Sequence, residues 1–299
     1  KTNLMKNKIA LIFDFDITLS PYYQQRKIIE HWRIDETTFW QQCTDKVQKE
    51  DYDLEHGYIK VLTEYIAKND KYKLSNNDLF TLGQKIELYE GLSRKENNSI
   101  FDELQAITKK EEYSEQNIEI ECYCISGGLE RMVAGAFEAH NLNGYFKKIY
   151  ACRLDEDENK NISYPKETVG HTIKTQKLYQ IAKGLNKDVN EVTTEYTIPF
   201  ENMIFIGDGL TDIPAFSLIN SMGGISIAVY RESKNSDGTI NQEKTLKDYE
   251  TGYKLAVESQ RAKQLLPADY SSGKPLNLAL LNYVKELCEK IKSDTFRNI

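Results

Sequence analysis

Two aspartates separated by one residue follow directly on an apolar run near the start of the chain. The run covers residues 9–13, IALIF, and the acids are Asp14 and Asp16. A run with β-branched residues and no alternation of apolar and polar positions favours a strand buried on both faces of a parallel α/β sheet. Binding sites in such sheets lie beyond the carboxyl ends of the strands. The spacing therefore predicts two carboxylates at the edge of a site.

A period of two would direct the side chains of Asp14 and Asp16 to one side of the chain. Two carboxylates this close repel each other unless a cation or a shared proton lies between them. A divalent cation with oxygen ligands meets that need, and Mg²⁺ is the hard cation that we expect. In a simpler interpretation the two acids only cap the next element, because short motifs often occur by chance.

A second apolar run, residues 118–125, leads into Ser126, Gly127 and Gly128, and helical periodicity follows over residues 129–140. A hydroxyl group, exposed backbone N–H groups and the positive end of a helix dipole together form a site that can bind an anion. The alternative is an ordinary turn from a strand to a helix.

A third apolar run, residues 202–206, ends at Asp208, which lies between Gly207 and Gly209 and precedes Asp212. Glycines let the backbone come close to a ligand, but a dinucleotide fingerprint would need a third glycine. Further strands are predicted over residues 146–154 and 224–230. Further helices are predicted over residues 174–185, 246–265 and 276–291.

The segment between the first two motifs has the periodicity of helices throughout. Helices are predicted over residues 22–33, 36–49 with Asp35 as N-cap, and 54–68, followed by one that Ser75 and Asp78 open with a capping box. Another helix is predicted over residues 92–110. The pattern thus indicates an all-helical insert at residues 21–92, directly after the first strand.

Composition narrows the class of protein. The 299-residue chain has a net charge of −7, which argues against nucleic acid as a partner because phosphate binding needs a basic surface. We see no apolar stretch that could cross a membrane and no signal peptide, so we expect a soluble, cytoplasmic protein without membrane partners. The five cysteines, an odd number, predict no disulfide framework.

The order of four motifs resembles the haloacid dehalogenase-like (HAD) superfamily of phosphohydrolases over essentially the whole chain. The motifs are D-x-D-x-T at residues 14–18, S-G-G at 126–128, a lysine at the start of a helix, and G-D-G-x-T-D at 207–212. The resemblance implies an α/β fold in two domains. A Rossmann-like parallel sheet core would comprise residues 1–20 and 93–299, and a helical C1-type cap would comprise residues 21–92.

The resemblance also implies a role for each motif residue. Asp14 would be the nucleophile that forms an aspartyl-phosphate, and Asp16 the general acid and base. The phosphoryl group would be held by Thr18, Ser126, Gly127 and Lys174, for which Lys177 is the alternative. Mg²⁺ would be held by Asp14, the backbone carbonyl of Asp16 and Asp208, with Asp212 in support.

The implied function is Mg²⁺-dependent hydrolysis of a small phosphate monoester, a phosphorylated metabolite. The alternatives are a phosphotransferase with the same chemistry and a non-catalytic module that binds a phosphoryl group or a partner. The layout is most similar to the phosphoserine phosphatase branch. That branch carries a glutamate where this chain has Tyr23, which argues against phosphoserine as the substrate. The sequence leaves the oligomeric state open.

Overall fold

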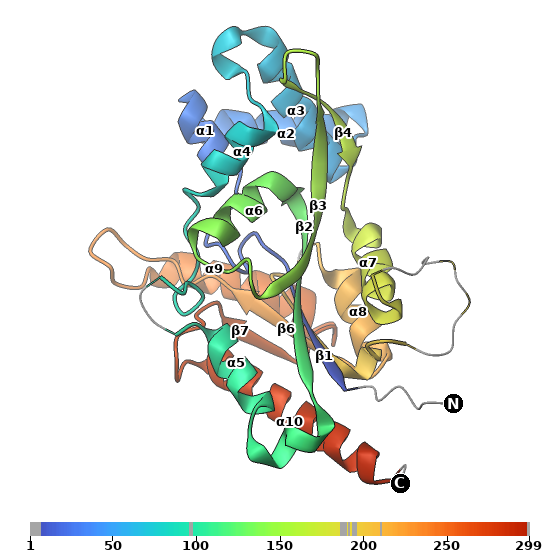
Figure 1. Ribbon diagram of the computed structural model, residues 1–299. Helices are drawn as coiled ribbons and strands as arrows, with labels where there is room; N and C mark the ends of the chain where they lie inside the picture. The colour runs from blue at the N-terminus through green and yellow to red at the C-terminus, as the bar shows by residue number, and fades with distance from the viewer. Residues whose placement is uncertain are drawn as a thin grey trace.

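A seven-stranded sheet forms the centre of the molecule in the computed structural model, which describes residues 7–95, 98–185, 190, 192, 196–209 and 211–297 (Figure 1). The strand order is β4-β3-β2-β1-β5-β6-β7, and neighbouring strands are parallel except for the antiparallel pair β3 and β4. The strands are β1 (Lys8–Phe13), β2 (Glu119–Leu129), β3 (Phe146–Glu156), β4 (Ile162–Glu167), β5 (Met203–Gly207), β6 (Ile225–Tyr230) and β7 (Gln264–Pro267). The predicted α/β fold is confirmed.

Strand β1 lies at the middle of the sheet because its apolar residues need cover on both faces. Alternate residues of β1 enter two different core clusters. Leu11 and Phe13 pack in the cluster of α5 (Ile100–Thr108), α6 (Glu130–Ala139) and α10 (Pro275–Arg297). Ala10 and Ile12 pack in the cluster of α7 (His171–Lys183) and α8 (Ile213–Ser221). The core is thus a sheet between two helical layers.

The register of the parallel strands brings the three predicted motifs to one edge of the sheet. Phe13, the last residue of β1, pairs with Cys124 of β2 and with Ile206 of β5. The backbone N–H of Asp14 continues this ladder and donates to the carbonyl of Ile206 at 2.9 Å. Residues that follow these pairs therefore meet at the carboxyl ends of the strands.

Four helices between β1 and α5 form a separate layer above this edge, which we call the cap (Figure 1). They are α1 (Arg26–Trp32), α2 (Glu36–Glu50), α3 (Leu54–Lys68) and α4 (Asn76–Gly83), with the 3₁₀ turn η1 (Asp70–Tyr72) before α4. The predicted N-cap of α2 is confirmed, since Asp35 accepts a hydrogen bond from the Thr38 N–H, and so is the capping box of Ser75 and Asp78. The cap boundaries at residues 21 and 92 stay a prediction.

The hairpin of β3 and β4 extends beyond the sheet to the cap (Figure 1). The N–H of Ile162 donates to the carbonyl of Leu74 at 2.8 Å, and Asn76 donates to Leu154 and Glu156. Strand β4 was not predicted, because its sequence ISYPKE is polar and contains a proline. The hairpin joins cap and core in addition to the two covalent connections and to the close packing of α4 on α6, where a Cβ at Gly83 would lie 2.2 Å from the Met132 carbonyl oxygen.

Three predicted helices differ from the structure. The helix predicted over residues 22–33 begins only at Arg26, because the N–H of Gln24 is bound to the Asp16 side chain. The one predicted over residues 92–110 shortens to α5. The one predicted over residues 246–265 is wrong at its end: α9 (Gln242–Gly252) continues as a π-helical turn (Tyr253–Val257), and residues 264–267 then form β7 beside β6. A short apolar run fits an edge strand as well as a helix.

The remaining short elements are the 3₁₀ turns η2 (Glu111–Gln116) before β2 and η3 (Phe200–Asn202) before β5. Among the described helices, none is both long enough and apolar enough to cross a membrane.

Candidate active site

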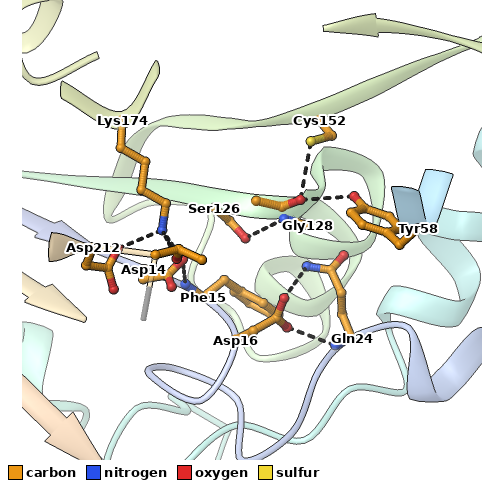
Figure 2. Close-up of polar contacts among 12 residues, drawn as sticks. Asp14, Phe15, Asp16, Gln24, Tyr58, Ser126, Gly128, Cys152, Lys174 and Asp212 are labelled. Atoms are coloured by element: carbon orange, nitrogen blue, oxygen red, sulfur yellow. Dashed lines mark hydrogen bonds and ion pairs between the residues drawn. The ribbon is translucent and has the colours of Figure 1, made fainter. Parts of the chain in front are cut away.

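A buried lysine joins two of the predicted acids at the carboxyl edge of the sheet. Lys174 on α7 has no exposed surface, and its Nζ lies 3.2 Å from Oδ1 of Asp14 and 2.7 Å from Oδ1 of Asp212 (Figure 2). It also donates to the hydroxyl of Thr211 at 3.1 Å. A lysine is buried at this depth only when it is paired. The ion pairs therefore fix the relative positions of β1, α7 and the loop before α8.

The charges of this cluster act on one another. Burial lowers the pKa of Lys174, but the Asp14, Asp212 and Asp208 carboxylates outweigh that effect and raise it above its ordinary value, so the lysine stays a cation. Burial also raises the pKa of Asp14, and the neighbouring carboxylates add to the rise while Lys174 opposes it. One lysine does not neutralise several carboxylates, so the cluster needs further positive charge.

The acid cluster fits a divalent cation. Asp14, Asp208 and Asp212 can each offer one carboxylate oxygen, all within 4.8 Å of one another. The second oxygen of Asp212, Oδ2, is buried and has no hydrogen-bond partner among the described residues. Three carboxylate oxygens this close together, with a further Asp212 oxygen that lacks a partner, form a donor set that suits Mg²⁺.

Asp16 lies beside this cluster in a different environment. Its carboxylate accepts hydrogen bonds from the backbone N–H of Gln24 at 2.8 Å and from Nε2 of Gln24 at 3.4 Å (Figure 2). The chain turns after Asp16 through Ile17, whose φ of 60° is unusual for a β-branched residue. Burial raises the pKa of Asp16 to about 7, against the hydrogen bonds from Gln24, which lower it. This carboxyl group can therefore gain or lose a proton near neutral pH.

Gln24 is a residue that sequence reasoning missed. Its side chain is fully buried, and besides binding Asp16 its Oε1 accepts from the N–H of Leu129 at 2.9 Å. A side chain at Gly128 would collide with it, since a Cβ there would lie 1.9 Å from Nε2 of Gln24. Gln24 thus holds Asp16 against the start of α6, and the only sequence signal was a polar residue inside a predicted helix.

The Ser-Gly-Gly motif forms the end of β2. The Ser126 hydroxyl accepts from the N–H of Gly128 at 3.0 Å, and the Gly127 carbonyl accepts from the Tyr58 hydroxyl at 3.0 Å and from the Cys152 thiol at 3.3 Å (Figure 2). Tyr58 belongs to α3, so this bond connects the cap with the floor of the site. The three contacts fix the orientation of the Gly127 peptide.

Thr18 and Lys177, two other predicted residues, do not line the cavity. Thr18 is fully buried, and its Oγ1 has no hydrogen-bond partner among the described residues, while its carbonyl accepts from the Tyr270 hydroxyl at 2.9 Å. Its contribution to phosphate binding stays a prediction. Lys177 forms an ion pair with Glu167 at 2.7 Å. Of the two candidate lysines, Lys174 is the one that reaches Asp14.

A cavity of about 540 Å³ opens between the core and the cap. Its floor, from the core, consists of Asp14, Asp16, Gly127, Gly128, His171, Asp208 and Thr211. Its wall, from the cap and the loop before α1, consists of Tyr23, Gln25, Trp40, Cys43, Thr44, Val47, Gln48, Leu54, Glu55 and Tyr58. The floor is polar and charged, and the wall is mainly apolar and aromatic, an arrangement typical of a small-molecule site.

Comparison with known proteins agrees with this arrangement. No family model matches the chain. An uncharacterized protein of Borreliella burgdorferi is 32% identical over 242 residues, which cover 74% of this chain and 81% of that protein. A relative this similar over most of its length shows common membership of one family.

Solved structures show which fold this family has. A HAD family hydrolase of Salmonella enterica serovar Typhi aligns with a TM-score of 0.51 at 18% identity, covering 77% of this chain and 64% of that one. A phospho-aspartyl intermediate analogue of phosphoserine phosphatase aligns with a TM-score of 0.52 at 17% identity over 93% and 99% of the two chains. Cytosolic 5′-nucleotidase IIIB bound to cytidine aligns with a TM-score of 0.51 at 12% identity over 96% and 88%. The chain therefore belongs to one family with the Borreliella burgdorferi protein, and its fold is that of the HAD hydrolases.

Proposed function

We propose that the protein is a Mg²⁺-dependent phosphatase that hydrolyses a small phosphate monoester through a phosphoryl group carried on Asp14. The observation that carries the proposal is the buried cluster in which the Lys174 ammonium lies 3.2 Å from Asp14, beside the acids Asp208 and Asp212. A carboxylate attacks a phosphate ester only where positive charge offsets the repulsion between the two anions. This cluster combines a nucleophile, a fixed cation and the oxygen ligands for a second cation.

The carboxylates divide the reaction into two steps. In the first, an Asp14 oxygen attacks phosphorus, the bond from phosphorus to the ester oxygen breaks, and Asp16 gives its proton to the departing oxygen. In the second, Asp16 takes a proton from water as the water attacks phosphorus, and phosphate leaves with Asp14 restored. Lys174 offsets the charge of Asp14 and of the phosphoryl oxygens in both steps.

Asp14, Asp208 and the backbone carbonyl of Asp16 would hold Mg²⁺, with Asp212 in support beside Lys174. When bound, Mg²⁺ supplies positive charge to the phosphoryl oxygens. Gln24 keeps the Asp16 carboxyl group at one place for both proton transfers, because it binds Asp16 through its backbone and its side chain. The cap covers the cavity and limits the access of bulk water to the aspartyl-phosphate.

The similar folds support a phosphate ester as the substrate. The solved neighbours include phosphoserine phosphatases and a 5′-nucleotidase, whose names describe esters of phosphate with different alcohols. What they share is the phosphoryl group, which the floor would bind. The alcohol part would contact the wall, where this chain has Tyr23 and Trp40.

The test is phosphate release from 4-nitrophenyl phosphate and from a panel of phosphorylated metabolites, with Mg²⁺ and with a chelator. We expect release that needs the metal in the wild type and in Asp45→Asn, a variant of a partly exposed residue of α2, and none in Asp14→Asn. Turnover by Asp14→Asn, or turnover undiminished by the chelator, would contradict the proposal. Transfer of the phosphoryl group to added alcohols without release to water would instead identify a phosphotransferase.

A further inference from the structure

Glu55 is a buried carboxylate that the proposed chemistry does not use. It lies in the first turn of α3, is only 6% exposed, and lines the cavity. Its oxygens lie over two glycines: a Cβ at Gly170 would be 2.9 Å from Oε2, and one at Gly127 would be 3.3 Å from Oε1. The carboxylate therefore occupies the boundary between wall and floor, beside the Ser-Gly-Gly motif.

The position of Glu55 is fixed by its neighbour on the helix. Tyr58 lies three residues further along α3, on the same face of the helix, and its hydroxyl binds the Gly127 carbonyl (Figure 2). That bond holds this face of α3 against the floor. Glu55 is thus directed toward the cavity by a contact that does not involve its own side chain.

No hydrogen bond or ion pair reaches the Glu55 carboxylate from the part of the chain that the structure describes. Gly170 is the N-cap of α7, so the positive end of that helix dipole lies close to the carboxylate and partly offsets its charge. The Glu55 oxygens are not among the fully enclosed, unpartnered atoms, since the residue lines the cavity. They are therefore placed to accept hydrogen bonds from a donor on a bound ligand.

The charge of the cavity indicates what kind of donor fits. Four carboxylates line it, those of Asp14, Asp16, Asp208 and Glu55, and no lysine or arginine is among its described lining residues. Lys174 lies beneath the floor, where it serves Asp14 and Asp212. The wall around Glu55 therefore favours a cationic group over a neutral or anionic one.

The rest of the wall indicates what carries the cation. Trp40 and Tyr23 form an aromatic pair with ring centroids 5.4 Å apart, and Leu54 and Val47 add apolar surface. Such a surface accepts an apolar or aromatic group, and the faces of aromatic rings also attract cations.

From these observations we propose that Glu55 is a specificity residue, which selects phosphate monoesters whose alcohol part carries a protonated amine on an apolar or aromatic body. The carboxylate accepts the ammonium hydrogen bonds while the phosphoryl group lies at Asp14. This inference rests on the proposed function, because it places the phosphoryl group on the floor.

The experiment compares two esters of nearly equal size, 4-(aminomethyl)phenyl phosphate, which carries an ammonium group, and 4-ethylphenyl phosphate, which does not. We expect the wild type to hydrolyse the first with a kcat/KM about tenfold or more above the second, the range of a charged hydrogen bond. In Glu55→Gln that ratio should fall to near one. The control is Glu64→Gln, an exposed residue of the same helix that pairs with Lys46, and it should keep the wild-type ratio.

Equal kcat/KM values for the two esters in the wild type, or a preference that persists in Glu55→Gln, would overturn the inference and leave the proposed function intact. A loss of equal size for both esters in Glu55→Gln would show that the residue only holds the cap, and would also overturn it. If the wild type hydrolysed neither of these two esters while it still released phosphate from another ester of the panel, calorimetric binding of the two would decide, since the amine ester must bind more tightly and lose that advantage in Glu55→Gln. Release from no ester of the panel would instead mean that the proposed function fails, and this inference with it.

Discussion

The floor and the wall of the cavity are built on different principles. The floor consists of residues at the ends of β1, β2 and β5 and at the start of α7, held by a buried ion-pair cluster around Lys174. The wall comes from α2, α3 and the loop before α1, and most of its surface is apolar or aromatic. Under the proposed function, this difference assigns the breaking of the phosphate ester bond to the floor and the choice of alcohol to the wall.

The two regions meet at a few defined contacts. Tyr58 binds the Gly127 carbonyl, and Gln24, in the loop that leads to the cap, binds both Asp16 and the N–H of Leu129. Substitutions in the floor should therefore lower kcat, and substitutions in the wall should mainly raise KM. Substitutions at the contacts between them should have smaller effects on kcat than those in the floor. The following variants test that division, from the largest expected effect to the smallest.

Asp16→Asn removes the acid and base of the floor. We expect kcat/KM for an alkyl phosphate to fall by about 10²- to 10⁴-fold, because the departing oxygen receives no proton. The loss should be smaller for 4-nitrophenyl phosphate, whose leaving group needs little protonation. Steady-state rates on both esters measure the difference, and an equal loss on both would contradict the role of Asp16 as the acid.

Gln24→Leu keeps the volume of a fully buried side chain but removes its hydrogen bonds to Asp16 and Leu129. We expect kcat to fall by about tenfold with KM nearly unchanged, because the Asp16 carboxyl group, then held only by the backbone N–H of residue 24, is less well positioned for proton transfer. Thermal unfolding serves as the control for folding. A rise in KM without a fall in kcat would show that Gln24 belongs functionally to the wall.

Trp40→Ala opens the aromatic wall and leaves the floor untouched. KM for an aryl phosphate should rise by about tenfold from the lost apolar and ring contacts. KM for acetyl phosphate, which has no ring, should stay within experimental error of the wild type. An equal rise in KM for both substrates would contradict the comparison, because the wall would then not contact the group attached to the phosphate.

Tyr58→Phe deletes one hydrogen bond between cap and core. The expected cost is about 1 kcal/mol in the free energy of unfolding, measured by urea denaturation, because the buried Gly127 carbonyl keeps the Cys152 thiol as a donor. Activity should change by less than about fivefold for a loss of this size. A much larger loss of activity would mean that Tyr58 contacts the substrate directly.

The elements of the floor could be predicted because their signals are local. The motifs at Asp14, Ser126 and Asp208 each follow an apolar run that fits a buried strand, and parallel strands bring their carboxyl ends to one edge. The places of Lys174 and Asp212 were expected from the resemblance to the HAD superfamily. Asp14, Lys174 and Asp212 accordingly lie together. The structure was needed to distinguish Lys174 from Lys177, because the two are one helical turn apart and only the first reaches Asp14, whereas the second pairs with Glu167 of β4.

The residues of the wall and its contacts were not predictable in the same way. Gln24 and Glu55 have ordinary polar side chains in stretches with helical periodicity, and nothing local shows that they are buried. Their burial results from the docking of α3 and of the loop before α1 on Gly127, Gly128 and Gly170, which are distant in sequence. Strand β7 was missed for a related reason, since its place depends on the free edge of β6.

The most direct test of the account is to find the phosphoryl group on the enzyme during turnover. The Asp16→Asn variant, in which breakdown of the intermediate is slowed, would be mixed with 4-nitrophenyl phosphate and Mg²⁺, quenched in acid and analysed by peptide mass spectrometry. We expect one phosphoryl group on the peptide with Asp14, and none after the additional change Asp14→Asn. Turnover with no phosphoryl group on the peptide that contains Asp14 would contradict the account.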